Sequence, residues 1–265
     1  DEEPWVEAMH HPYPERCWAA MARAANYVDR FISPSAWYAD RMAMRLGIAR
    51  ERIAVVPLGV DAAGVTPAPQ PPEHPTIGFL ARLNEAQGLG ILADAFFRLR
   101  KDPALARLRL IATGGHTPAD TPFLDKLRTR AREEHCEDDL VFLEDFQRIS
   151  RVEFMHSLSV LCVPTPGGEA FGMQLLEANA AGVPVVQPDA GAYPEVVAAT
   201  GGGLIYDPAR QGALEEALGA LLRDPERARA MGQRGRETIL ARFSIEHAAQ
   251  HLTEVFAHTA KGTTA

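Results

Sequence analysis

The chain has 265 residues, of which 46% are hydrophobic and 23% charged, a globular composition that allows a substantial core. The formal net charge of -8 argues against a nucleic-acid-binding protein, because such proteins gather basic side chains to face phosphates. No apolar stretch is long enough to span a bilayer, and residues 1–20 carry acids, prolines and histidines in place of the apolar run of a signal peptide.

Three cysteines, Cys17, Cys136 and Cys162, are widely spaced, which fits neither a disulfide framework nor a zinc site. We therefore expect a reducing, cytoplasmic setting. Cys162 lies in an apolar run and is predicted to be a small core residue. Because the chain begins at Asp1 with acids and a proline, we expect it to be a fragment of a longer protein.

The first part of the chain, residues 1–60, has two segments with helical spacing and two short apolar runs typical of strands. In chain order these elements are 15–30, 31–32, 36–46 and 53–57. The turn that ends at Ser35 is suited to cap the second helix, and Gly47 is suited to end it. Residues 61–75 are rich in proline and lack periodicity, so we predict a linker there.

From Thr76 onward, predicted strands alternate with predicted helices. The strands are 76–80, 108–112, 140–143, 160–164, 183–187 and 204–206. The helices are 89–100, 123–134, 151–158, 173–182, 194–199, 211–222, 225–240 and 244–258. This alternation predicts an α/β fold, a parallel sheet with helices on both faces. Ligands of such sheets bind at the carboxyl ends of the strands.

The most informative stretch joins the strand at 160–164 to the helix at 173–182 through a glycine-rich turn. A turn of this kind presents backbone N–H groups and a helix N-terminus to an anion. Glu169 lies in the turn and Glu177 in the second turn of the helix, so two carboxylates accompany the anion site. The combination suits a ligand with hydroxyls at one end and phosphates in its middle, such as a sugar nucleotide.

Several motifs in order along the chain resemble the retaining, GT-B-fold glycosyltransferases of family 4. The most specific is Glu169-Ala170-Phe171-Gly172 with Leu176-Glu177-Ala178, the family's pair of glutamates separated by seven residues. Further matches are Val55–Asp61, Pro164-Thr165, Ala181–Val186, Gly191 with Glu195, and Phe243–Glu246. The resemblance extends over nearly the whole chain.

The resemblance implies a Rossmann-like nucleotide-sugar domain from a protein with two such domains. It divides the chain into a remnant of the N-terminal, acceptor-side domain (1–60), the linker (61–75), the donor-binding domain (76–242) and a C-terminal helix and tail that crosses toward the first domain (243–265). The expected partners are a nucleotide-sugar donor, an acceptor of unknown identity and the missing N-terminal domain. Neither nucleic acid nor a transmembrane segment is expected.

The resemblance also assigns roles to side chains. Glu177 matches the glutamate that binds the ribose, although a carboxylate near a helix start is also stabilised by the helix dipole. Glu169 matches the catalytic glutamate near the donor sugar, and an exposed loop acid is the alternative. Arg82 matches the arginine that binds the diphosphate and stabilises the leaving group, a second catalytic role. A solvated arginine after a strand is its alternative.

Other predicted donor contacts come from backbone groups. Main-chain N–H groups of Phe171, Gly172 and Met173 are expected to face sugar hydroxyls or phosphate, while the Phe171 ring belongs to the core. Gly114 begins a glycine turn at the cleft, and Phe146 lies in the segment expected along the base.

Gln87 departs from the family, which carries a lysine there as a second cation beside the diphosphate. A glutamine donates a hydrogen bond but does not neutralise charge, and losing one such stabiliser costs on the order of 10² to 10³ in rate. Three explanations are open: an altered donor or a substitute cation such as Arg98 or Lys101, weakened or lost transfer, or an engineered change. The glycine that the family has before Arg82 is Ala81 here.

We expect no cofactor beyond the nucleoside-diphosphate sugar, which is a co-substrate, and no required metal, because Arg82 and helix dipoles offset the diphosphate charge. A nucleotide-sugar-binding module without transfer is the alternative function, motivated by Gln87. An epimerase or a phosphorylase on the same fold is set aside, since no lysine is well placed to hold a pyridoxal cofactor.

Overall fold

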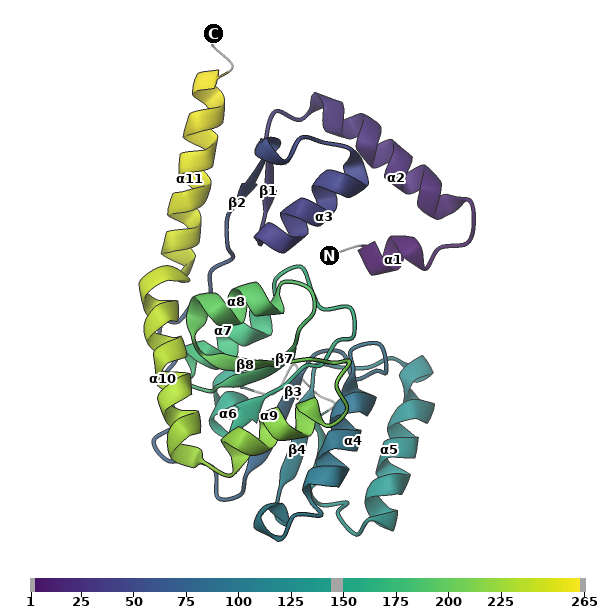
Figure 1. Ribbon diagram of the computed structural model, residues 1–265, viewed down its shortest axis with the longest axis vertical. Coiled ribbons are helices and arrows are strands. Elements are labelled where there is room, and N and C mark those ends of the chain that lie inside the picture. The colour runs from purple at the N-terminus through teal and green to yellow at the C-terminus, as the bar shows by residue number, and fades with distance from the viewer. Residues whose placement is uncertain (1–2, 144–149, 263–265) are drawn as a thin grey trace.

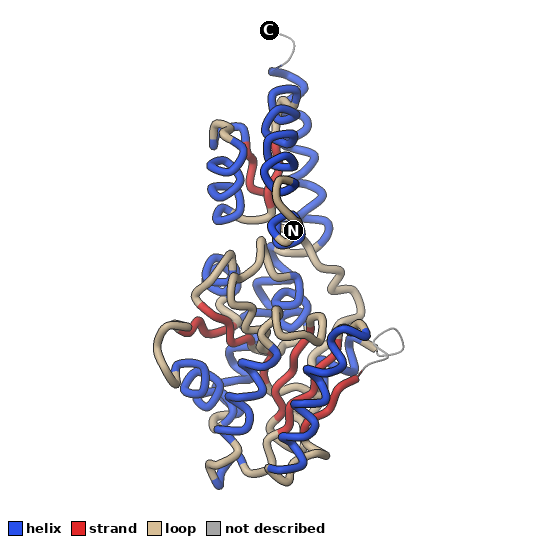
Figure 2. Tube along the Cα trace, turned by 90° about the vertical axis from the view of Figure 1, so that its right-hand side faces the viewer, coloured by secondary structure: helices blue, strands red, loops and turns tan. Residues whose placement is uncertain are grey.

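The computed structural model describes residues 3–143 and 150–262; residues 1–2, 144–149 and 263–265 lie outside the described ranges. The described strands form a six-stranded and a two-stranded sheet. The two sheets lie toward opposite ends of the molecule (Figure 1, Figure 2). No described helix is both long enough and apolar enough to cross a membrane.

The larger sheet contains β3 (Thr76–Leu80), β4 (Arg109–Thr113), β5 (Leu140–Leu143), β6 (Val160–Leu161), β7 (Val185–Pro188) and β8 (Gly203–Tyr206). All its strand pairs are parallel, and their order is β5-β4-β3-β6-β7-β8. The chain therefore builds one half of the sheet outward from β3 and the other half outward from β6. This doubly wound order confirms the predicted Rossmann-like α/β fold.

Helices cover both faces of this sheet (Figure 1). The helices are α4 (Leu89–Leu99), η3 (Pro103–Leu105), η4 (Pro118–Asp120), α5 (Thr121–Glu133), α6 (Arg151–His156), α7 (Met173–Ala180), α8 (Tyr193–Thr200), α9 (Ala213–Leu222) and α10 (Pro225–Arg242). One core contains apolar residues of α4, α5 and α9, and the other contains residues of α6, α7, α8 and α10. Ile77 and Phe79 of β3 belong to the first core and Leu80 to the second, as expected for successive side chains of a strand buried on both faces.

The strand β6 is shorter than the predicted 160–164. It ends at Leu161, and beyond it the Thr165 N–H donates to the Val163 carbonyl over 2.8 Å. Pro164 has no N–H to donate to a neighbouring strand. The chain therefore turns toward α7 three residues earlier than the apolar pattern indicates.

The smaller unit contains α1 (Glu3–Glu7), α2 (Tyr13–Ala24), η1 (Ala25–Tyr27), β1 (Phe31–Ser33), α3 (Ala36–Leu46), η2 (Arg50–Arg52) and β2 (Ile53–Val55), with β1 and β2 parallel. The predicted caps of α3 are confirmed: the Tyr38 N–H donates to the Ser35 hydroxyl over 3.1 Å, and Gly47 has a left-handed φ of 64°. The short helix α1 has no capping signal in the sequence and was not predicted.

The chain passes between the two units twice, after β2 and again between α10 and α11 (Ile245–Gly262). At the junction Val60 forms a parallel bridge with Ser244, and the Val60 N–H donates to the Phe243 carbonyl over 2.8 Å. From there α11 extends toward the end of the molecule where the two-stranded sheet lies (Figure 1, Figure 2).

Candidate functional site

The candidate site lies at the carboxyl ends of β3 and β6, the two strands from which the sheet is built outward. Arg82 and Gln87 follow β3, Gly114 follows β4, and the turn with Glu169 follows β6. Doubly wound folds bind ligands at the carboxyl ends of the strands where the strand order reverses in this way. The fold thus places the predicted residues from Arg82 to Glu177 in segments that follow the strands β3, β4 and β6.

Two glycines let these loops touch. Gly88 has φ 82°, and a Cβ there would overlap the carbonyl oxygen of Pro164. Gly114 has φ 139°, and a Cβ there would overlap the carbonyl oxygen of Ala81. Only glycine combines a left-handed backbone with so close an approach. The loops after β3, β4 and β6 are therefore packed against one another backbone to backbone.

Arg82 is held after the end of β3 by hydrogen bonds to the capping box of η4. Its Nη2 donates to Asp120 Oδ2 over 3.1 Å and to Thr117 Oγ1 over 3.0 Å. Hydrogen bonds from the Thr117 hydroxyl and N–H, with a further one from Arg82, lower the pKa of Asp120 to about 2. The Arg82 side chain is 51% exposed, so its guanidinium remains accessible to an anion.

Gln87 belongs to a chain of hydrogen bonds that joins the start of α8 to the loops after β6 and β3. The Tyr193 hydroxyl donates to Thr165 Oγ1 over 3.3 Å, and that hydroxyl donates to Gln87 Oε1 over 3.3 Å. Arg98 does not replace the missing cation, because it lies at the far end of α4, about 15 Å away at 1.5 Å per residue, and pairs with Glu215. Lys101 lies beyond that same end of α4.

Glu169 is half-buried and held at both its side chain and its backbone. Its Oε1 accepts from Gln174 Nε2 over 3.1 Å, and its carbonyl accepts from the Ala192 N–H over 2.9 Å. Burial first, and then the nearby charge of Glu169, raise the pKa of the Tyr193 hydroxyl, so that this tyrosine stays protonated. These hydrogen bonds fix the direction in which the Glu169 carboxylate points.

The N-terminus of α7 directly follows the turn that carries Glu169. Phe171 is 5% exposed and its ring packs in the core, as predicted. Gly172 caps the helix with φ 93°, close above the Tyr193 ring. Within the described part of the chain, the N–H groups of Phe171, Gly172 and Met173 have no protein acceptor. Free N–H groups at a helix start are suited to bind an anion.

Glu177 lies one helical turn further along α7. Its side chain is 31% exposed, and its Oε2 accepts from Arg151 Nη1 over 3.4 Å. Burial raises the pKa of Glu177, and the charge of Arg151 opposes that shift. The carboxylate is thus partly desolvated and has one long, exposed ion pair, which a ligand can replace at low cost.

The structure adds partners that the sequence did not indicate, namely Asp120, Arg151, Gln174 and Tyr193. Gln174 and Tyr193 carry a weak sequence signal, since each is a polar side chain in the first turn of a helix. Phe146, predicted to lie along the base, and its neighbour Gln147 lie outside the described residues.

Glu195 caps a helix of the other unit. It lies in the first turn of α8, yet its carboxylate accepts from the N–H groups of Ala36 and Trp37 at the start of α3, over 2.9 and 3.1 Å. The family resemblance and helix capping were equally good explanations of this residue. The structure shows capping across the two units.

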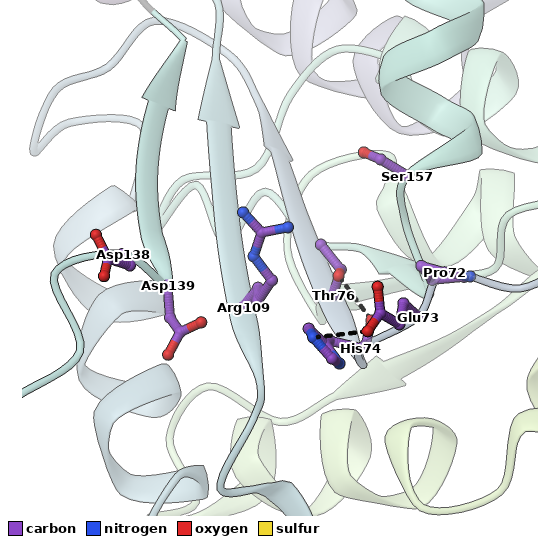
Figure 3. Close-up of a pocket in the computed structure, with 8 residues that line it drawn as sticks. All are labelled: Pro72, Glu73, His74, Thr76, Arg109, Asp138, Asp139 and Ser157. Carbon is purple, nitrogen blue, oxygen red and sulfur yellow. Dashed lines mark hydrogen bonds and ion pairs between the residues drawn. The ribbon is translucent and has the colours of Figure 1, made fainter.

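A separate cavity of about 480 Å³ lies at the opposite, amino-terminal edge of the sheet (Figure 3). Arg109 of β4 stands between Asp138 and Asp139 on one side and His74 on the other (Figure 3). None of the predicted site residues lines it. In the described ranges, no group of three or more His, Cys, Asp or Glu residues is arranged to hold a metal ion.

Two families match the sequence. Residues 67–238 match the family Glycosyl transferases group 1, and residues 3–63 match Glycosyltransferase Family 4. Among curated relatives, D-inositol 3-phosphate glycosyltransferase of Nocardia farcinica is 30% identical over 238 residues, which are 86% of this chain and 52% of the relative. A GDP-mannose-dependent alpha-(1-6)-phosphatidylinositol monomannoside mannosyltransferase of Mycobacterium tuberculosis is 28% identical, covering 89% and 63%. The chain spans only about half to two thirds of these proteins.

Solved structures share the fold. Sucrose-phosphate synthase from Thermosynechococcus elongatus superimposes with a TM-score of 0.77 at 22% identity, covering 97% of this chain and 66% of that one. Anabaena Alr3699/HepE in complex with UDP and glucose gives 0.79 at 19% identity, covering 91% and 66%.

Proposed function

The chain belongs to the glycosyl transferases group 1 family, and we propose that it is the donor-binding part of a retaining glycosyltransferase that uses a nucleoside-diphosphate sugar. Two similar proteins support the donor class: one relative is a GDP-mannose-dependent mannosyltransferase, and one protein of similar fold was solved in complex with UDP and glucose. The single observation that carries the proposal is that the loop after β3, which carries Arg82, is hydrogen-bonded through Gln87 to Thr165 in the loop after β6, which leads through Glu169 into α7 and Glu177.

In the proposed complex, Arg82 and the free N–H groups at the start of α7 bind the diphosphate. Glu177 accepts hydrogen bonds from the ribose hydroxyls. Glu169, oriented by Gln174, lies at the donor sugar. As the bond between sugar and phosphate breaks, negative charge grows on the leaving diphosphate, and Arg82 with the α7 dipole stabilises it.

The proposal includes three finer points. The sugar is transferred with retention of configuration to an acceptor of unknown identity, bound beside the N-terminal domain of the whole protein. The positive groups already present make a metal ion unnecessary. Free thiols at Cys17, Cys136 and Cys162 support a reducing, cytoplasmic location.

Calorimetry with UDP, GDP and ADP, each in EDTA and in magnesium, tests the donor site. We expect one nucleotide to bind with the same affinity in both buffers. Binding of none of them would refute the donor site, and binding only with magnesium would refute the metal-free part. If the intact protein hydrolyses the matching sugar nucleotide, the anomer released first, read by NMR, tests retention.

A binding module without transfer is the second candidate, favoured by Gln87, whose side-chain oxygen is already bonded to Thr165. Replacing Gln87 by Lys restores the family's cation. If the chain is an enzyme weakened at this position, Gln87→Lys should raise donor hydrolysis by roughly 10²-fold. Gln233→Lys, which adds the same charge on the exposed face of α10, is the control. Unchanged hydrolysis with nucleotide still bound would favour the module.

A further inference from the structure

The N-terminus of α3 is docked directly on the turn that carries Glu169, across the boundary between the two units. Ser35 Oγ donates to the Ala170 carbonyl over 2.6 Å. The Ala36 and Trp37 N–H groups donate to the two carboxylate oxygens of Glu195 over 2.9 and 3.1 Å. Ser35 is fully buried. Hydrogen bonds thus join three consecutive residues of the small unit to the turn that contains Ala170 and to the first turn of α8.

The hydrogen bonds that Glu195 accepts are of a strong type. A carboxylate that accepts two backbone N–H groups at a helix start gains from charge-assisted hydrogen bonds and from the helix dipole. The carboxylate lies at the start of α3 while its own residue is in the first turn of α8, so it faces the positive ends of two helices. It fixes the first turn of α8 relative to α3.

The start of α8 also holds the turn that carries Glu169. The Ala192 N–H donates to the Glu169 carbonyl, and the Tyr193 ring lies below Gly172. Gly168 and Gly191 meet so closely that a Cβ on either would overlap the backbone of the other loop. The two adjacent carbonyls of Glu169 and Ala170 are therefore anchored separately, one by the turn that Glu195 fixes and the other by Ser35.

We propose that Ser35 and Glu195 are positioning residues, and that docking of α3 sets the direction of Glu169 at the sugar end of the donor site. The inference rests on the proposed function and deepens it. At the nucleotide end, Arg82 and Glu177 form no hydrogen bond or ion pair with α3 among the described residues. Recognition of the sugar depends on the docked small unit, and recognition of the nucleotide does not.

Two variants of the whole chain, Ser35→Ala and Glu195→Gln, test this inference. If one variant fails to fold, the other still provides the test. Ser244→Ala is the matched control. It removes another serine N-cap, at the start of α11, and in the part of the chain that the structure describes Ser244 forms no hydrogen bond with the turn that carries Glu169. Hydrogen exchange of the Gly168 and Ala192 amides in ligand-free protein is the first readout. Calorimetry with a nucleoside diphosphate and with its sugar nucleotide is the second.

We expect both variants to exchange these two amides about tenfold faster, the loss of about one hydrogen bond, and Ser244→Ala to leave them unchanged. The affinity for the nucleoside diphosphate should stay within about twofold of the wild type. The ratio of the sugar-nucleotide affinity to the diphosphate affinity should fall about tenfold. Exchange no faster than in Ser244→Ala would overturn the inference. An equal loss of diphosphate and sugar-nucleotide affinity would also overturn it, because a merely structural tie has that effect.

The two proposals fail separately. If the wild-type protein binds no nucleotide, the donor site is refuted, and the exchange rates alone then decide whether α3 positions the loop. If nucleotide binds normally while exchange does not change, the donor site stands and the positioning role falls.

Discussion

Replacing Glu177 by Gln is expected to weaken nucleotide binding and, in the same molecule, to stabilise the ligand-free fold at neutral pH. The carboxylate is 31% exposed and its ion pair with Arg151 spans 3.4 Å. It therefore loses hydration on folding without gaining a short, buried partner. A carboxylate in this environment is explained better by a role in ligand binding than by a contribution to the stability of the fold.

The binding loss follows from the acceptors that a ribose requires. Two vicinal hydroxyls donate to the two oxygens of a carboxylate, and a glutamine of the same shape keeps one oxygen and loses the charge. One hydrogen bond to a charged group contributes about 1.5–3 kcal/mol, so we expect Kd to rise about 10- to 100-fold.

The stability gain follows from the pKa. Burial raises the pKa of Glu177 above its ordinary value of 4.5, so the folded state holds the proton more tightly than the unfolded state. The stability from this group is fully present below 4.5 and is lost as pH rises through the raised pKa. Gln cannot ionise, so the variant should unfold at higher urea than the wild type at pH 8, and the difference should shrink as pH falls toward 5.

Urea unfolding across this pH range and calorimetry with the cognate nucleotide measure both effects. Glu216→Gln is the control: hydrogen bonding to Arg210 lowers the pKa of Glu216, so its removal should not stabilise the protein or alter nucleotide binding. A Glu177→Gln variant that binds nucleotide like the wild type would refute the ribose assignment. A variant less stable than the wild type at pH 8 would refute the desolvation argument.

Two further predictions concern Arg82 and the loop contact. Arg82→Gln should weaken binding of the diphosphate by about 10- to 100-fold while changing the affinity for the corresponding nucleoside monophosphate less, and should leave urea stability nearly unchanged because its ion pair is exposed. Equal losses for both nucleotides would contradict a role at the diphosphate. Gly88→Ala should destabilise the fold by about 3 kcal/mol or more, whereas Gly212→Ala, also a left-handed helix cap but with open space around it, should cost only about 1–2 kcal/mol in unfolding experiments. Equal costs would show that the contact with Pro164 contributes nothing.

The sequence predicted the sheet and its helices because their signals are local. Apolar runs such as Thr76–Leu80 appear in strands that are buried on both faces, and Ser35 and Gly47 mark the ends of α3 through their own backbone preferences. Strand β6 was predicted too long because the apolar run continues through Cys162, Val163 and Pro164, beyond the end of the strand at Leu161.

The candidate site was predicted as a set of residues but not as a network. Glu169, Glu177 and Arg82 are identifiable from motifs, since each lies next to a strand end or a helix start. Their partners are distant in sequence: Arg82 pairs with Asp120, and Glu195 binds residues 159 and 158 positions away. No spacing rule links such pairs, because the sheet and its connections bring them together.

The bridge between Val60 and Ser244 limits how the two units can move. Both passages of the chain between them are tied at this one place, so they cannot bend at separate points. The motion that breaks the fewest contacts is a rotation about that junction. Such a rotation swings the start of α3 along an arc and separates it from Ala170 and Glu195 together. The small unit therefore gains or loses its contacts with Ala170 and Glu195 as one set.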